Sequence, residues 1–375
     1  MLEATLDALP QSLPRLSADR ATSIVAVAGA HPPNHYSQDE LLGAIRTYWG
    51  AQHHNPARLE SLHRSVCVGE RYLALAIEDY PKLAGFGDAN DAYVRVGTDV
   101  AAEALGEALR LAGLAPADVD CVFFTSVTGI AVPSIDARLI NRLGMRPDVK
   151  RIPIFGLGCV AGAAGIARVH DYLLAWPEHV AVLVSLELCS LTLQRDDLSI
   201  PNLIASGLFG DGAAAVVMTG NTRAATLRSA CGPRVLATRS RFYPNTERVM
   251  GWDVGDSGFR IVLSAGVPDV VRNFLAEDVS GFLRDVGVGR EEIRSWICHP
   301  GGPKVLDAFE DALGLSSGEL SITRRSLAEV GNMSSSSVLF VLRDTIAGAR
   351  PARGTKGLML ALGPGFCSEL VLVEW

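Results

Sequence analysis

The sequence predicts an α/β fold built from two copies of one unit, and two observations support this prediction. First, helix-like and strand-like segments alternate along most of the 375 residues, as they do in α/β proteins. Residues 99–112 and 160–176 have the pattern of helices, whereas 119–126 and 181–186 have that of buried strands. Second, similar segments recur in the same order in the second half of the chain, which indicates a duplication.

Three pairs of segments carry the repeat. Each pair shares an order of glycines, small or polar residues and an apolar run, although identity within a pair is low. The pairs are 108–125 with 282–299, 158–173 with 331–346, and 210–218 with 363–373. The offset between partners is 174 in the first pair and 173 in the second, and the third pair follows in the same order, so we expect two structurally equivalent halves.

The repeat places three chemically active residues at related positions. Cys159 and Asn332 become equivalent, each where a helix is expected to begin, and His299 follows a predicted strand. Ligands of α/β proteins gather at the carboxyl ends of strands and at helix N-termini. We therefore expect these three side chains to meet at one site.

The three residue types suit nucleophilic catalysis. Cys159 lies among glycines and alanines in I-F-G-L-G-C-V-A-G-A-A-G, residues 154–165. A helix N-terminus and a nearby imidazolium, here His299, both favour the thiolate. Asn332 offers an amide N–H donor for an oxyanion. Taken singly, a packed cysteine, a histidine at the end of a strand and an asparagine N-cap are simpler interpretations, and only the combination favours a site.

Charge and cysteine usage exclude several classes of protein. The net charge of -7 disfavours nonspecific binding of nucleic acid. The apolar run 181–193 contains Glu187 and is too short to span a membrane, and the N-terminus lacks the pattern of a signal peptide. The seven cysteines include no C-x-x-C pair, which predicts reduced thiols in the cytoplasm and neither a disulfide framework nor a metal site.

Five motifs in a fixed order resemble those of the type III polyketide synthases, the chalcone-synthase-like branch of the thiolase superfamily. The resemblance covers residues 24–375. The motifs are G-L-G-C-V-A-G-A-A-G (156–165), L-F-G-D-G-A-A-A (208–215), C-H-P-G-G-P-K-V-L-D-A (298–308), G-N-M-S-S-S-S-V (331–338) and G-P-G-F-C-S-E-L (363–370). The resemblance implies a thiolase-like, duplicated αβαβα layered fold. We expect an N-terminal extension at 1–23, a half carrying the cysteine at 24–220 and a half carrying the histidine and asparagine at 221–375.

The resemblance also implies a role for each residue. Cys159 would take the starter acyl group from an acyl-CoA. His299 and Asn332 would hold the malonyl-CoA carbonyl and stabilise the enolate formed on loss of CO2, with His299 also pairing with Cys159 as its imidazolium. Substrate-binding roles are expected for Phe209 as gatekeeper, for the cyclisation loop Gly363, Pro364 and Gly365, for Val132 reaching into a dimer partner, and for Cys189, Thr192, Ile261 and Ser334.

A narrower likeness is to bacterial alkylpyrone and alkylresorcinol synthases, carried by M-G-W-D-V-G (250–255) and V-T-G-I-A-V-P-S-I-D-A-R (127–138). Ile261 stands where plant relatives place a phenylalanine, which fits a channel for a fatty acyl tail. The resemblance thus predicts a cytoplasmic homodimer that uses a long-chain acyl-CoA and malonyl-CoA, makes an alkylpyrone or alkylresorcinol, and needs no cofactor, nucleic acid or membrane span.

Three other functions stay open at this point. An initiating β-ketoacyl-ACP synthase shares the Cys-His-Asn set but is expected to carry H-Q-A-N where this chain has H-P-G-G-P-K. A cysteine hydrolase and a non-catalytic scaffold of the same fold are the others. The sequence leaves open the starter, the number of extensions, malonyl against methylmalonyl preference and the product. It also leaves open which basic residue meets the CoA phosphates, the candidates being Arg58, His63, Arg64 and Arg71.

Overall fold

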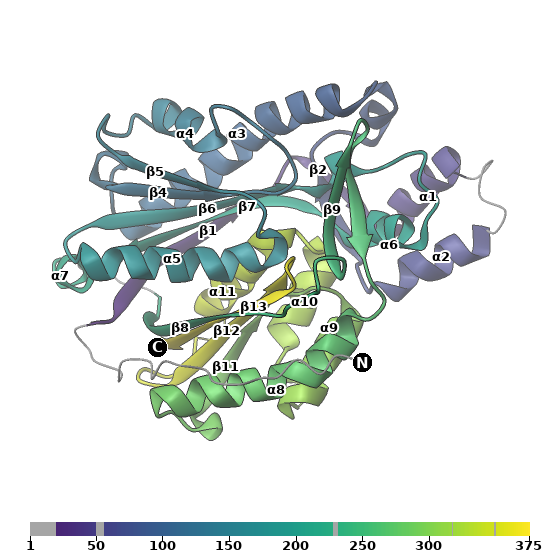
Figure 1. The fold of residues 1–375 in the computed structure, drawn as a ribbon. Helices are drawn as coiled ribbons and strands as arrows, with labels where there is room; N and C mark the ends of the chain where they lie inside the picture. Colours follow the sequence, from purple (N-terminus) through teal and green to yellow (C-terminus); the bar gives the residue numbers. More distant parts are fainter. Residues whose placement is uncertain (1–19, 50–55, 228–231, 317, 349) are drawn as a thin grey trace.

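The computed structural model describes residues 20–49, 56–227, 232–316, 318–348 and 350–375 (Figure 1). The strands are β1 (Thr22–Ala30), β2 (Asn34–Ser37), β3 (Glu70–Leu73), β4 (Cys121–Thr125), β5 (Lys150–Ile154), β6 (Val180–Leu188), β7 (Asp211–Thr219), β8 (Arg234–Phe242), β9 (Met250–Gly255), β10 (Gly258–Leu263), β11 (Ile293–Cys298), β12 (Lys356–Gly363) and β13 (Cys367–Glu374). The helices are α1 (Gln38–Trp49), α2 (Pro56–Ser65), α3 (Phe86–Ala112), α4 (Ile135–Leu143), α5 (Ala161–Ala175), α6 (Ile200–Leu208), α7 (Asn221–Ala224), α8 (Val267–Val286), α9 (Pro303–Leu313), α10 (Ser321–Val330) and α11 (Ser337–Ala347).

The strand order confirms the predicted duplication. Nine strands form one sheet in the order β11-β12-β13-β8-β1-β7-β6-β4-β5. From its centre outward, each half runs antiparallel, antiparallel and then parallel: β1-β7-β6-β4 on one side and β8-β13-β12-β11 on the other. The halves join through a short antiparallel pairing of β1 with β8, in which Thr22 lies opposite Val235 and Ser23 opposite Arg234.

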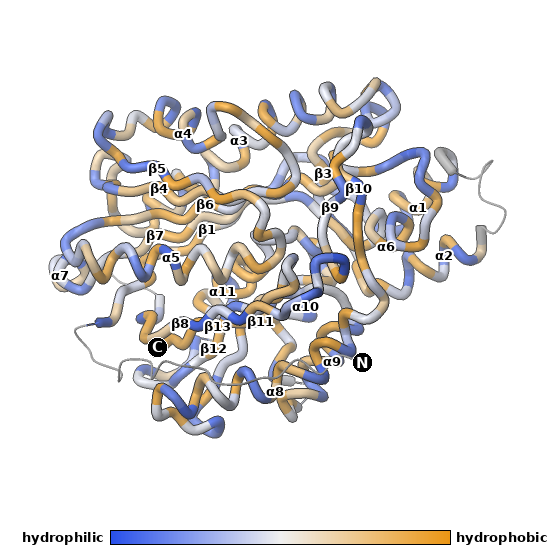
Figure 2. Tube along the Cα trace, in the orientation of Figure 1, coloured by the Kyte–Doolittle hydropathy of each residue, from blue (hydrophilic) through white to orange (hydrophobic). Residues whose placement is uncertain are grey.

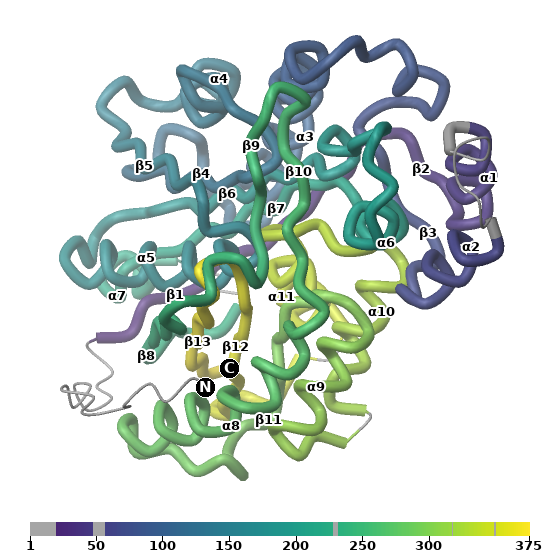
Figure 3. Tube along the Cα trace, turned by 45° about the vertical axis from the view of Figure 1, so that its right-hand side comes forward, coloured from purple at the N-terminus to yellow at the C-terminus, as the bar shows by residue number. Residues whose placement is uncertain are grey.

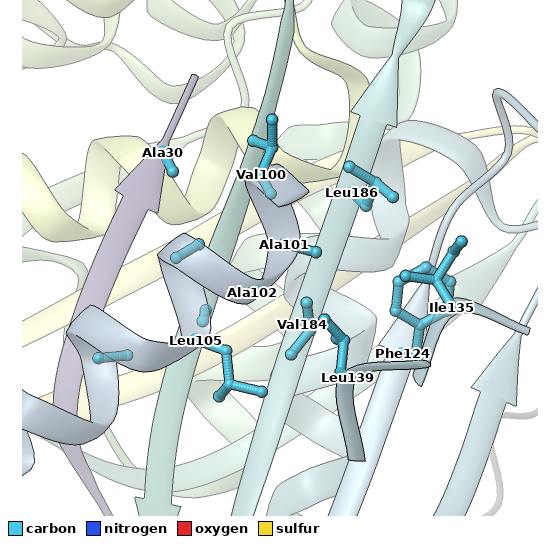
Figure 4. Packing of buried hydrophobic residues seen from close by; sticks show 14 of the residues in the cluster. Ala30, Val100, Ala101, Ala102, Leu105, Phe124, Ile135, Leu139, Val184 and Leu186 are labelled. Atoms are coloured by element: carbon cyan, nitrogen blue, oxygen red, sulfur yellow. The ribbon is translucent and has the colours of Figure 1, made fainter. Parts of the chain in front are cut away.

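Helices complete a five-layer arrangement (Figure 1). α3 and α4 cover the outer face of one half-sheet, α8 and α9 cover that of the other, and α5 and α11 lie between them. Both faces of β6 and β7 are therefore buried, which explains why these strands read as continuous apolar runs (Figure 2). Figure 4 shows Val100, Ala101 and Leu105 of α3 lying over Val184 and Leu186 of β6.

The two copies end their outer helices in the same way. α3 and α8 each stop at a left-handed glycine, Gly113 with φ 66° and Gly287 with φ 72°, a conformation that costs glycine little. A single 3₁₀ turn follows in both. There the carboxylates of Asp118 and Glu292 accept backbone N–H bonds at 2.8 Å from the residues three positions earlier. The turn then leads directly into β4 or β11.

Several expected boundaries need correction. The helix expected over 99–112 begins much earlier, at Phe86, because tertiary packing extends it through a first turn with weak helix formers. The strand expected over 181–186 is longer at both ends. Of the predicted extension at 1–23, residues 1–19 lie outside the described residues, but Thr22 and Ser23 belong to β1 because their backbones pair with β8. The boundary at 220/221 stays a prediction.

Two properties of the described residues bear on the sequence analysis. No helix among them is both long and apolar enough to cross a lipid bilayer. The six cysteines that the structure describes are free thiols, four of them buried: Cys121, Cys159, Cys189 and Cys298.

The closest approach of the two central helices depends on Gly162. A Cβ at this position of α5 would lie 2.3 Å from the backbone oxygen of Ser335, in the 3₁₀ turn before α11, and 2.6 Å from Cγ1 of Val338 in α11. We expect Gly162→Ala to force the helices apart and to lower the free energy of unfolding by about 1–3 kcal/mol, measured by urea denaturation. Gly106→Ala in α3 is the matched control, because no described atom lies within 4 Å of its Cβ and alanine is the better helix former. Equal stability of Gly162→Ala and the wild type would contradict the packing argument.

Candidate active site

A glycine-dependent turn presents Cys159. Gly158 has φ 56°, and a Cβ there would lie 2.7 Å from Cδ of Pro364, so only glycine fits without strain. The 3₁₀ turn Gly158–Val160 carries the cysteine and continues directly into α5. Cys159 therefore lies at the start of a helix, as the repeat predicted, and it is 9% exposed.

His299 continues the line of β11. Its backbone N–H donates to the carbonyl oxygen of Leu360 in β12 at 2.8 Å, which fixes the residue at the carboxyl end of the parallel strand pair. The side chain is buried. Neither ring nitrogen has a hydrogen-bond partner among the described residues, so both are available to a substrate.

Asn332 joins the site through its backbone and its side chain. It forms a bridge with Phe209, in which Asn332 N–H donates to Leu208 O at 2.9 Å and Gly210 N–H donates to Asn332 O at 3.0 Å. Its side-chain Oδ1 accepts from the N–H of Ser334 at 2.8 Å. The expected helix start at Asn332 is wrong: α11 begins at Ser337, and the asparagine instead closes a turn onto the residue two positions later.

One cavity of about 480 Å³, hereafter the main cavity, collects the predicted residues. Its wall includes Cys159, His299, Asn332, Ser334, Phe209, Cys189, Ile261 and Pro364. Two halves of a duplicated fold thus bring a thiol, an imidazole and a carboxamide to the same space. Cys159 Sγ and Ser334 Oγ are 3.6 Å apart, so the nucleophile contacts the turn that Asn332 holds.

Other predicted residues lie elsewhere. Thr192 lines a second, smaller cavity of about 80 Å³, the neck, which shares Cys189, Phe209, Trp252 and Ile261 with the main cavity. Gly363 packs against the cysteine turn, where a Cβ would lie 2.6 Å from the N of Val160, and neither Gly363 nor Gly365 lines the main cavity. Val132 is 95% exposed on the surface of the chain.

The β9–β10 hairpin, whose course Figure 3 shows, contributes Trp252 and Ile261 to the walls of both cavities. The sequence analysis expected a binding role for Ile261 but gave none to Trp252. Trp252 of β9 lies opposite Ile261 of β10 and is the bulkiest side chain between the main cavity and the neck. Gln194 anchors the hairpin, since its amide donates to the carbonyl oxygens of Ser257 and Phe259, each at 3.1 Å. Trp252 is part of the segment M-G-W-D-V-G, residues 250–255, which supported the narrower family likeness but did not by itself indicate a place in a cavity wall.

Burial controls the protonation of the catalytic pair. It raises the pKa of the Cys159 thiol to about 12, opposed by the hydrogen bond with Ser334, and lowers the pKa of His299 to about 3. Among the residues that the structure describes, no hydrogen bond joins the two side chains. Burial favours the neutral thiol and the neutral imidazole. The imidazolium–thiolate pair that the resemblance implies stays a prediction.

A buried carboxyl lies behind the nucleophile. Glu187 is 0% exposed and accepts hydrogen bonds from Val127 N–H at 3.1 Å, from Thr128 Oγ1 at 2.9 Å and from Ser335 Oγ. Burial raises its pKa to about 7, against the lowering effect of these donors. Sequence analysis noted Glu187 only as an interruption of an apolar strand, which is the signal that identifies it.

The structure buries two of the four basic residues that were candidates for meeting the CoA phosphates and exposes the other two. His63 and Arg71 are buried: His63 Nε2 contacts Ser206 Oγ at 3.1 Å, and Arg71 donates to the carbonyl oxygens of Ser206 and Gly207. Both therefore support α6 rather than meet a phosphate. Arg58 and Arg64 are exposed on α2, and Lys304, which sequence analysis overlooked, lies exposed in the wall of the main cavity. Among the described residues, no group of three or more His, Cys, Asp or Glu is arranged to hold a metal.

Comparison with known proteins finds the same family in both halves of the chain. The model for the N-terminal domain of chalcone and stilbene synthases matches residues 12–222, and the model for their C-terminal domain matches residues 234–374. A 1,3,6,8-tetrahydroxynaphthalene synthase of Streptomyces peucetius is 54% identical over 95% of this chain and 94% of its own length. A phloroglucinol synthase of Pseudomonas fluorescens is 33% identical over 92% and 96%.

A solved structure shares the fold. The crystal structure of 1,3,6,8-tetrahydroxynaphthalene synthase from Streptomyces coelicolor superposes with a TM-score of 0.88 at 32% identity, covering 94% of this chain and 99% of that one. The layered, duplicated arrangement is therefore that of the type III polyketide synthases.

Glu187 gives a pH-dependent prediction. Folding keeps its proton up to about pH 7, whereas an ordinary glutamate in the unfolded chain releases it near 4.5, so the stability from this group is lost as pH rises through that interval. Between about pH 5 and about pH 8, we expect the wild type to lose up to roughly 3 kcal/mol of unfolding free energy relative to Glu187→Gln. Urea denaturation of both proteins measures this difference. If the free energy of unfolding changed equally with pH in the wild type and in Glu187→Gln, Glu187 would be ionised in the folded protein throughout this pH range.

Proposed function

Because the chain belongs to the chalcone and stilbene synthase family of type III polyketide synthases, whose members are decarboxylating condensing enzymes, we propose that it builds a polyhydroxylated aromatic product from malonyl-CoA. The observation that carries this proposal is the position of Cys159, His299 and Asn332 in the wall of one cavity. The 54% identity to a tetrahydroxynaphthalene synthase supports the product class. Family membership sets aside the β-ketoacyl-ACP synthase and cysteine hydrolase alternatives.

Loading begins at sulfur. The Sγ of Cys159 attacks the carbonyl carbon of the starter thioester, its proton passes to the His299 imidazole, and the CoA thiolate leaves and takes a proton. The acyl group is then bound to Cys159 as a thioester. Positioning of both partners in a buried cavity replaces an encounter in water, which is a large part of such rate enhancements.

Extension requires a stabilised enolate. The carbonyl oxygen of bound malonyl-CoA would accept hydrogen bonds from the His299 ring and the Nδ2 of Asn332. Loss of CO2 leaves an electron pair that delocalises onto that oxygen, where the two donors stabilise it. The carbanion attacks the acyl carbon on Cys159, the carbon–sulfur bond breaks, and the lengthened chain leaves on CoA. The thioesters supply all the reacting groups of this step.

A second candidate is the long-chain activity that the narrower likeness implies. The neck favours it, because apolar side chains of α1 line this space, including Leu41, Ala44 and Ile45. An alkyl tail would pass Trp252 to reach them. Incubation with malonyl-CoA alone separates the candidates: an aromatic product detected by mass spectrometry supports the first, and turnover only with added fatty acyl-CoA, giving alkylpyrones or alkylresorcinols, supports the second.

We also propose that the enzyme works as a cytoplasmic homodimer. Ile130, Val132 and Phe155 are exposed apolar side chains of the same half, at 43%, 95% and 59%. Such exposure is costly unless a partner covers it. The predicted reach of Val132 into a neighbouring cavity belongs to this proposal.

Asn332→Asp tests the enolate step. Aspartate keeps the acceptor for Ser334 N–H but lacks the amide donor, so we expect CO2 release from malonyl-CoA to fall by about 10²- to 10³-fold. Loading of an acyl group onto Cys159 should persist in this variant, as measured by intact-protein mass spectrometry. Cys159→Ala is the matched control, with loading abolished. Unchanged CO2 release in Asn332→Asp would remove the asparagine from this role.

Trp252→Ala tests the wall between the main cavity and the neck. Removal of the indole should join the two spaces and admit longer acyl-CoA starters, seen as new products when the enzyme is offered a series of acyl-CoAs of increasing chain length. Trp176→Ala is the control, because Trp176 lies on the surface at 45% exposure. The same range of accepted starters in both variants would contradict the assignment.

A further inference from the structure

A polar cleft of about 360 Å³ opens beside the neck, and its function is not explained by the chemistry above. We call it the vestibule. Its wall includes Gln194, Arg195, Asp196, Asp197, Ser257 and Arg260. Both signs of charge and several amide and hydroxyl groups thus line this space, in contrast to the apolar neck.

The three cavities lie in a row. The neck shares four residues with the main cavity, and it shares Tyr80, Ser190 and Leu193 with the vestibule. A residue that lines two spaces shows that they are neighbours. A path from Cys159 through the neck to the vestibule would therefore pass these two sets of shared residues.

Tyr80, Ser190 and Leu193 close the path where the neck meets the vestibule. Tyr80 Oη and Ser190 Oγ are 2.5 Å apart, and the N–H of Ser190 donates to Asp211 Oδ1 at 2.8 Å, which fixes Ser190 in place. Leu193 is half-buried at the same junction. Opening of the path would require the Tyr80–Ser190 hydrogen bond to break and Leu193 to move aside. Ser190 Oγ also donates to Asp211 Oδ2, and Tyr80 Oη accepts from the N–H of Leu75 at 3.3 Å.

We propose that this path is an exit for the finished, hydroxylated aromatic product, separate from the mouth that CoA thioesters use. The inference rests on the proposed function. Each condensation brings malonyl-CoA in and releases CoA through the main mouth, where Lys304 lies. Ring closure by attack of a carbanion of the chain on its own thioester carbonyl breaks the last carbon–sulfur bond. CoA leaves and takes up a proton as the thiol, so the finished product no longer carries it. The polar vestibule suits a compact molecule with several hydroxyl groups, because the carboxylates of Asp196 and Asp197 in its wall can accept hydrogen bonds from them. The Gln194 amide and the Arg195 guanidinium already donate to backbone carbonyl oxygens. An alkyl tail emerging there would meet charged groups.

Two variants narrow the path at different points. Leu193→Trp fills the junction, and Ala84→Trp adds bulk at an exposed position of the vestibule wall, where folding is not at risk. Leu111→Trp is the matched control, since Leu111 is 45% exposed on α3 and lines none of these cavities. Thermal unfolding of each variant checks that it folds.

Rapid-quench and steady-state measurements with malonyl-CoA then separate chemistry from release. We expect both path variants to form the first equivalent of enzyme-bound product at the wild-type rate, followed by a several-fold slower steady state, because release has become limiting. Leu111→Trp should behave as the wild type. Unchanged steady-state rates in the folded path variants would overturn the exit. Failure of the wild type to form a first equivalent would instead overturn the proposed function.

Discussion

The close contact between α5 and α11 is the constraint on which the site depends. Gly162 allows the start of one helix to approach the backbone of the turn before the other, and both helices lie between the half-sheets. The residues that precede each helix are therefore brought together: Cys159 before α5, and Asn332 and Ser334 before α11. The four consecutive serines 334–337 belong to this contact. Ser185 of β6 bonds the hydroxyls of Ser335 and Ser336 at 2.8 and 2.9 Å, so polar groups at the helix junction are satisfied within the protein.

Burial gives this site its chemical character. The strand ends and helix starts form a wall of mostly apolar side chains, so charge on sulfur, imidazole or carboxyl is disfavoured until a substrate supplies its counterpart. The same environment strengthens hydrogen bonds to an enolate oxygen, because apolar surroundings lower the local dielectric constant. A neutral resting thiol and imidazole are thus compatible with strong stabilisation of charge that develops only during reaction.

The sequence predicted the duplicated α/β fold and the meeting of Cys159, His299 and Asn332, because glycine positions, strand patterns and helix starts recur between the halves. It did not predict the start of α3 at Phe86, where long-range packing outweighs local propensity. It also missed Trp252 and Glu187. Their roles depend on which cavity or side chain each strand lies beside, and the pattern within a single strand does not show this. The family likeness gave the reaction class correctly, but its narrower form pointed to alkyl products, whereas two similar relatives are named for polyhydroxylated rings.

The backbone bridge between Phe209 and Asn332 has a mechanical consequence. Two peptide hydrogen bonds join the segment that holds this aromatic ring to the segment that holds the carboxamide. A displacement of one segment would carry the other with it, so the Phe209 ring and the Asn332 carboxamide keep a fixed relation to each other in the wall of the main cavity.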